Sequence, residues 1–252
     1  MPTLRDWLAE GPFTLGLSSG FFGFYAHAGV VAALEDEGLW PARLCGSSAG
    51  ALVGGLTAAG VPAGRLCREL LALRRQDFWD PAPGLGLLRG ARFRALLAGL
   101  LPVATFEACP RPLAVSAFDL VRRRTAVLDA GPLAPAIYAS CAAPFLFQPI
   151  RIGGQLLLDG GVRDRPGLGG RGPPGRLLHH HLTSRSPWRR PGSPALRAPA
   201  GPDLEVVALE GLPRLGPFRL ERAAEAMALA ADGLRAALGR PVGGAGSPGR
   251  AG

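Results

Sequence analysis

The pentapeptide Gly46-Ser47-Ser48-Ala49-Gly50 constrains the fold more than any other stretch of the sequence. A short apolar run precedes it, and residues 51–56 are small and apolar enough for a buried helix. This pattern is typical of a nucleophile elbow, a sharp strand-to-helix turn in which Gly46 and Gly50 avoid collisions. It places the Ser48 hydroxyl at the end of a sheet, beside a helix N-terminus that favours developing negative charge. Because the chain has 37 glycines, an ordinary glycine-rich turn is the alternative interpretation.

The residues before the elbow predict a β-α-β unit. Residues 13–18 form an apolar run bounded by turn residues and predict a buried strand. Residues 19–23 predict a glycine-containing loop, and residues 28–38 predict a helix that ends at a glycine. Parallel strands in such a unit bring both loops to one edge of the sheet, so the first loop can supply oxyanion donors to Ser48. The predicted oxyanion donors are the backbone N–H groups of Ser19, Gly20 and Phe21.

Three motifs together resemble the patatin-like phospholipase family, over residues 13–181. They are a first loop followed by His27-Ala28-Gly29-Val30, the elbow, and Asp159-Gly160-Gly161, in the order of the family and at compatible spacing. A chance match would have to produce all three motifs in this order, so the resemblance is specific. The first loop departs from the family pattern G-G-G-x-R/K-G, because Ser19-Gly20-Phe21-Phe22-Gly23-Phe24 contains no basic residue.

The resemblance implies a three-layer α/β/α patatin-like fold with a mostly parallel central sheet. It also implies a serine lipid acyl hydrolase with a catalytic Ser48–Asp159 dyad. Asp159, with Gly160 and Gly161, follows a predicted strand at 155–158 and becomes the natural base for an elbow serine. The expected substrate is a phospholipid or another lipid ester, cleaved through an acyl-enzyme. The predicted reaction needs no metal and no cofactor.

Two other functions stay open. The order Ser48, then Asp129 or Asp159, then His179–His181 formally matches the catalytic triad of an α/β-hydrolase esterase. Against a triad, only two strands are predicted up to the elbow, and consecutive histidines in a strand alternate between its faces. The second alternative is a protein that binds lipid or a membrane surface without catalysis, which the altered first loop motivates. Neither Ser140, which lacks an elbow pattern, nor His27 receives a catalytic role.

Composition limits the partners. The net charge is +9, and every basic residue is arginine, which indicates a coding preference as much as a selected charge. No nucleic-acid-binding motif accompanies the charge, so we expect no nucleic-acid partner, whereas peripheral contact with a membrane is compatible with it. The four cysteines are scattered, and Asp6 and Glu10 interrupt any apolar leader, so we expect a cytoplasmic protein. The sequence does not indicate an oligomeric state.

We expect one patatin-like domain over residues 11–238, preceded by an N-terminal segment at 1–10. Residues 183–202 are rich in Pro, Arg, Ser and Gly and predict a flexible insert, and residues 239–252 predict a disordered tail. A helix predicted at 91–101 carries one apolar stripe. That stripe favours packing in the core over a role as a lid or membrane-docking helix.

Overall fold

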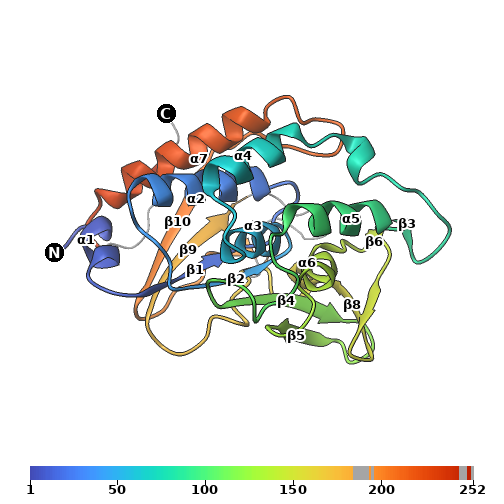
Figure 1. Ribbon diagram of the computed structural model, residues 1–252. Helices are drawn as coiled ribbons and strands as arrows, with labels where there is room; N and C mark the ends of the chain where they lie inside the picture. Colours follow the sequence, from blue (N-terminus) through green and yellow to red (C-terminus); the bar gives the residue numbers. More distant parts are fainter. Residues whose placement is uncertain (184–192, 194–195, 244–248, 251–252) are drawn as a thin grey trace.

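The computed structural model describes residues 1–183, 193, 196–243 and 249–250, and it has an α/β architecture (Figure 1). Its strands are β1 (Phe13–Leu17), β2 (Arg43–Ser47), β3 (Gly86–Leu88), β4 (Leu113–Asp119), β5 (Arg124–Leu128), β6 (Phe145–Phe147), β7 (Ile150–Ile152), β8 (Gln155–Asp159), β9 (Arg176–Leu182), β10 (Leu204–Glu210) and β11 (Gly249–Arg250). Its helices are α1 (Leu4–Ala9), α2 (Phe24–Asp36), α3 (Ala49–Ala58), α4 (Ala63–Ala72), α5 (Ala91–Leu100), α6 (Leu133–Cys141) and α7 (Ala223–Leu238), with 3-10 turns η1 (Arg75–Asp77) and η2 (Gly160–Val162).

The central sheet is mixed and mostly parallel. Parallel pairing joins β11, β10, β9, β1, β2 and β4 in that spatial order. Antiparallel pairing then adds β5 and β8 to β4, and β7 to β8. The predicted β-α-β unit is confirmed, since β1 and β2 run parallel on either side of the α2 connection. Its helix begins at Phe24 rather than at residue 28, because the loop before it is one tight turn closed by the Gly23 N–H and the Gly20 carbonyl.

The helices form one continuous layer, in which α7 packs on α2, α2 also contacts α3 and α4, and α3 contacts α6 (Figure 1). Leu17 and Leu113 point toward this layer, because a Cβ on Gly54 of α3 would lie 3.7 Å from the Cδ1 atom of each. Alternate residues of the same strands point to the other face. There, the described residues contribute the loop at 163–175, whose Leu168 lies against Gly16 of β1. The α/β class is therefore confirmed, with a loop covering this part of the second face in place of a helical layer.

Helix α1 lies within the segment expected to precede the domain, yet its Leu4 and Leu8 are buried in the main core. The Leu4 N–H donates to the Arg240 carbonyl, which joins this segment to the chain after α7. Most of the predicted insert, at 184–192 and 194–195, lies outside the described residues, as do 244–248 and 251–252 of the predicted tail. The domain bounds stay a prediction. No helix in the described part of the chain is both long and apolar enough to cross a bilayer.

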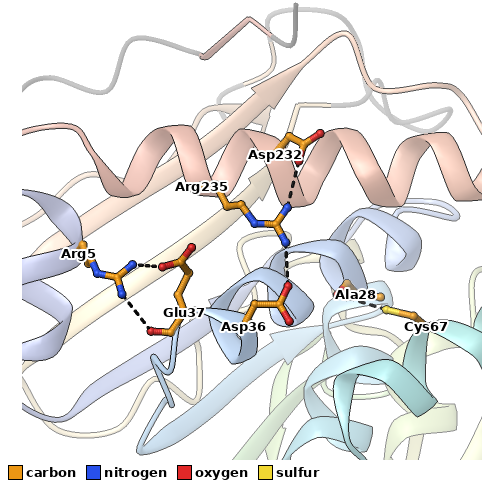
Figure 2. A network of polar contacts seen from close by, with 7 residues as sticks. All are labelled: Arg5, Ala28, Asp36, Glu37, Cys67, Asp232 and Arg235. Carbon is orange, nitrogen blue, oxygen red and sulfur yellow. Dashed lines mark hydrogen bonds and ion pairs between the residues drawn. The ribbon is translucent and has the colours of Figure 1, made fainter.

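Figure 2 shows ion pairs that join α1, α2 and α7 at the surface. Arg5 pairs with Glu37 at the end of α2, while Arg235 of α7 contacts Asp36 at 2.8 Å and Asp232 at 3.0 Å. Exposed ion pairs of this kind contribute little to the free energy of unfolding, about 0–1 kcal/mol each. The packing of α7 on α2 must therefore come mainly from their apolar faces, which include the buried Ala226, Met227, Ala230 and Leu234 of α7.

We expect Gly29→Ala to loosen this helix pair. A Cβ at Gly29 would lie 2.1 Å from the Met227 carbonyl oxygen of α7, so the two backbones would have to separate. The expected loss is about 1–3 kcal/mol in the free energy of unfolding, measured by urea denaturation. Gly99→Ala in α5 is the matched control, because a Cβ there meets nothing within 4 Å and should stabilise the helix by up to about 1 kcal/mol. Equal effects of the two changes would contradict the close approach of α2 and α7.

Candidate active site

The pentapeptide at 46–50 forms a sharp turn between β2 and α3. Ser48 follows β2 and precedes α3, and its backbone angles are φ 52° and ψ −116°. A positive φ is strained for a residue with a side chain, and such strain persists only where the surroundings impose it. A Cβ on Gly50 would lie 2.1 Å from the Leu17 carbonyl oxygen, and one on Gly46 would lie 2.6 Å from the Gly50 carbonyl. Both positions therefore require glycine, so that α3 can start directly against β1.

Strand β4 brings Ser48 and Asp159 together. β2 and β8 lie along the same side of β4, because β5 occupies its other side. β2 runs parallel to β4 and ends where Ser47 pairs with Ser116, whereas β8 runs antiparallel and ends where Asp159 pairs with Ala117. The two strands thus point at each other and stop at neighbouring positions, which places the serine and the aspartate in the gap between their ends.

The Ser48 hydroxyl donates a hydrogen bond to Asp159 Oδ2 at 2.6 Å. The other carboxylate oxygen, Oδ1, accepts the Gly161 N–H at 2.8 Å, so Asp159 caps its own turn as well as holding the serine. Gly160, the first residue of η2, lies against the Ser116 carbonyl. Burial raises the pKa of Asp159 to about 6, although the Ser48 and Gly161 hydrogen bonds act in the opposite direction. A carboxylate with this pKa is a suitable base near neutral pH.

The three backbone N–H groups predicted as oxyanion donors differ in their hydrogen bonding. The Ser19 N–H donates to the Arg165 carbonyl at 2.7 Å and is therefore occupied. Within the described part of the chain, the N–H groups of Gly20 and Phe21 have no hydrogen-bond acceptor. Both residues line the same pocket as Ser48. Arg165, a buried arginine that the sequence did not single out, also lines this pocket and donates to the Leu182 carbonyl at 2.9 Å.

Ser48 and Asp159 lie in the wall of a pocket of about 410 Å³. The other walls are mostly aromatic and aliphatic side chains from the first loop, the start of α2, α3, the end of η1, α5 and β6, among them Phe22, Phe24, Leu52, Phe78, Phe93, Leu96, Leu146 and Phe147. The apolar stripe of the α5 helix is divided between two environments. Leu97 and Leu100 are buried in the core as predicted, whereas Phe93 and Leu96 face the pocket. The site is thus a polar pair at the wall of an apolar cavity.

Comparison with known proteins identifies the family. The family model described as patatin-like phospholipase matches residues 15–169. The chain belongs to the patatin-like phospholipase family. Uncharacterized NTE family proteins of Mycobacterium tuberculosis and Mycobacterium bovis are 34% identical to it over 157 residues, 60% of this chain and 42% of each relative. This chain therefore spans less than half the length of those relatives. The crystal structure of VipD from Legionella pneumophila shares the fold, with a TM-score of 0.63 and 14% identity over 91% of this chain and 67% of VipD.

Ser140, to which the sequence assigned no role, supports the elbow of this patatin-like domain. Its Oγ accepts the Ser48 N–H at 2.9 Å and donates to the Ser116 carbonyl at 2.6 Å. The neighbouring Cys141 donates its S–H to the Ser48 carbonyl at 3.1 Å. The C-terminal turn of α6 therefore fixes the backbone of the strained serine on both sides. No local pattern marks Ser140, because only the packing of α6 on β4 brings it there.

We expect Ser140→Ala to weaken both the fold and the site. The change leaves the Ser48 N–H and the Ser116 carbonyl without this partner, which costs about 1–3 kcal/mol in the free energy of unfolding. Under the predicted role of Ser48 as nucleophile, displacing its hydroxyl by a fraction of an ångström should lower kcat by about tenfold or more, with little change in KM. Steady-state kinetics and thermal melting measure the two effects, and an unchanged kcat in the folded variant would contradict the positioning role.

The four histidines of the chain are buried, and none hydrogen-bonds to Ser48 or Asp159 among the described residues. His27 Nδ1 lies 2.8 Å from His180 Nδ1, and His27 Nε2 lies 2.8 Å from the Ser18 carbonyl, to which it must donate. His180 therefore donates to His27, and this pair holds the residue just before the first loop. Burial lowers the pKa of His27, His179, His180 and His181, so all four are neutral at neutral pH. This geometry offers no support for a triad.

Among the described residues, no group of three or more His, Cys, Asp or Glu side chains could hold a metal ion. The predicted absence of a metal or cofactor in the reaction stays a prediction.

Proposed function

We propose that this chain is a serine acyl hydrolase that cleaves fatty-acyl esters of phospholipids or related lipids through a Ser48–Asp159 dyad. The proposal depends chiefly on the 2.6 Å contact between Ser48 Oγ and Asp159 Oδ2 in the wall of an apolar pocket. Membership of the patatin-like phospholipase family supports the lipid substrate class.

In the first half-reaction, Asp159 takes the hydroxyl proton of Ser48 while Ser48 Oγ attacks the ester carbonyl carbon. The resulting oxyanion accepts hydrogen bonds from the Gly20 and Phe21 N–H groups, which need no particular side chain. The neutral Asp159 then protonates the departing alcohol as its bond to the acyl carbon breaks. This mechanism works without the basic residue that the first loop lacks.

In the second half-reaction, a water molecule gives a proton to Asp159 and its oxygen attacks the acyl-Ser48 carbonyl. The new oxyanion is held by the same loop, and its collapse returns the proton to Ser48 and releases the fatty acid. The apolar pocket walls suit the acyl chain, because an apolar chain transferred from water to such walls gains free energy in proportion to its buried area.

The test uses the purified chain with a fluorophosphonate probe, a nitrophenyl ester and dispersed phospholipid. We expect labelling at Ser48, a pre-steady-state burst from the acyl-enzyme, and release of free fatty acid. Absence of labelling and of turnover, in a chain that still binds lipid, would favour the non-catalytic alternative. Labelling without phospholipid cleavage would support a serine esterase and would contradict phospholipid as its substrate.

A further inference from the structure

Large apolar side chains are exposed around the mouth of the active-site pocket. Phe21 and Phe145 both line the pocket, yet they are 46% and 74% exposed. Other lining residues, such as Leu52 and Phe147, are buried. The residues that line the pocket and also face solvent mark its opening, so this opening is bordered by aromatic rings. Val162, from the turn after Asp159, adds a third exposed apolar side chain to the lining.

The two-stranded sheet of β3 and β6 extends this apolar surface. Phe145 is the first residue of β6, which pairs with β3, and the two strands lie together beside α5 (Figure 1). In β3 and the residue just before it, the buried Gly86 and Leu88 alternate with Leu85 and Leu87, which are 70% and 51% exposed. Neither Leu85 nor Leu87 lines the pocket, so contact with an acyl chain inside the pocket does not explain their exposure.

A third exposed aromatic residue lies near the Phe21 side of the opening. Phe218 is 68% exposed and stacks edge-on against Trp79, with the Arg75 guanidinium 5.1 Å from its ring centre. A Cβ on Gly216 would lie 4.0 Å from the Phe21 ring, so the segment that carries Phe218 passes beside the first loop. Exposed apolar residues at or near this opening thus come from five separate segments of the chain.

Exposed arginines accompany these residues in the chain. Arg89 follows β3 directly, Arg163 follows Val162, and Arg219 follows Phe218. In the part of the chain that the structure describes, none of the three forms an ion pair with an acidic side chain. Arginines therefore adjoin the exposed apolar residues at three points along the chain, and the Arg75 guanidinium adds a positive charge over the Phe218 ring.

We infer that this surface docks the protein on an anionic phospholipid bilayer, with Leu85, Leu87 and the rim aromatics entering the interface. Apolar side chains flanked by arginine match a layer of acyl chains beneath anionic headgroups. The surface surrounds the pocket opening, so a docked molecule receives an acyl chain without exposing that chain to water. The transfer of an acyl chain from the bilayer into the pocket rests on the proposed function. The exposed side chains and charges of the docking surface do not depend on catalysis.

The binding test uses Ser48→Ala protein, so that no lipid is consumed during flotation with phosphatidylcholine vesicles, with and without phosphatidylglycerol. We expect flotation that strengthens with phosphatidylglycerol and falls at least about tenfold in Leu85→Ser/Leu87→Ser. Arg89→Gln/Arg219→Gln should lose the preference for phosphatidylglycerol. Trp40→Ser is the matched control, because Trp40 is 47% exposed but precedes β2, at the opposite edge of the sheet from Ser48.

The catalytic test separates docking from chemistry. In an otherwise unchanged chain, Leu85→Ser/Leu87→Ser should keep turnover of a soluble short-chain ester and lose turnover of vesicle phospholipid in parallel with binding. Vesicle binding without any ester turnover would overturn the proposed function and leave the docking surface intact. Failure of the Ser48→Ala chain to float, or equal flotation of the double leucine variant, would overturn docking. A concentration-dependent dimer that the leucine changes dissolve, without vesicle binding, would instead identify the surface as a contact between copies.

Discussion

Ser48→Ala and Asp159→Asn should each lower ester turnover by about 10³-fold or more. Under the proposed mechanism, alanine removes the atom that becomes acylated, and asparagine removes the base while keeping the shape of the side chain. If the two residues act as one unit through their 2.6 Å contact, as proposed, the double variant should be no worse than the poorer single variant. Nitrophenyl ester kinetics measure all three, with folding checked by circular dichroism.

Ser47→Ala is the matched control for these variants. Ser47 precedes the nucleophile in the same turn, but its buried hydroxyl has no hydrogen-bond partner in the described part of the chain. Its removal should leave turnover within a few-fold of the original. Retained turnover in Asp159→Asn would contradict the dyad. A folded His180→Gln variant as inactive as Ser48→Ala would restore the triad, which the 2.8 Å His27–His180 contact argues against.

The edge of the sheet that carries Ser48 and Asp159 could be predicted because its signals are local. The elbow needs glycine on both sides of Ser48, and the contacts at Gly46 and Gly50 provide the physical reason. An apolar strand before each motif then places Ser48 and Asp159 at strand ends, where the structure also has them. Their catalytic roles stay predictions.

The meeting of Ser48 with Asp159 could not be derived from local pattern. It depends on the pairing of β8 with β4, which is antiparallel and on the same side of β4 as β2. The residues of a strand do not indicate in which direction it pairs. The parallel pairing of β3 with β6 joins three-residue strands far apart in the sequence, which are too short to show a period. Ser140 was missed for the same reason, because its hydrogen bond spans 92 residues.

The charge of Asp159 should limit both activity and stability, in opposite directions. Its pKa of about 6 predicts that kcat/KM falls about tenfold for each pH unit below 6 and is flat above, because only the carboxylate can accept the Ser48 proton. An aspartate has a pKa near 3.8 when it is not shifted, so the folded state binds more protons than the unfolded state between about pH 4 and 6. Stability therefore decreases as pH rises through this window, and the buried charge costs up to about 3 kcal/mol above it.

Asp159→Asn should accordingly melt several degrees higher than the original chain at about pH 8, and this advantage should shrink toward pH 4. The asparagine fits, since its Oδ1 can still accept the Gly161 N–H while its amide donates to Ser48 Oγ. Asp164→Asn is the contrasting control. Each carboxylate oxygen of Asp164 accepts a backbone N–H, and Oδ2 also accepts the Ser116 hydroxyl. The NH₂ group of an asparagine at this position would face one of these N–H donors, so Asp164→Asn should destabilise the fold. A lower melting temperature for Asp159→Asn than for the original chain at pH 8 would contradict this prediction. It would show that the buried Asp159 carboxylate stabilises the fold.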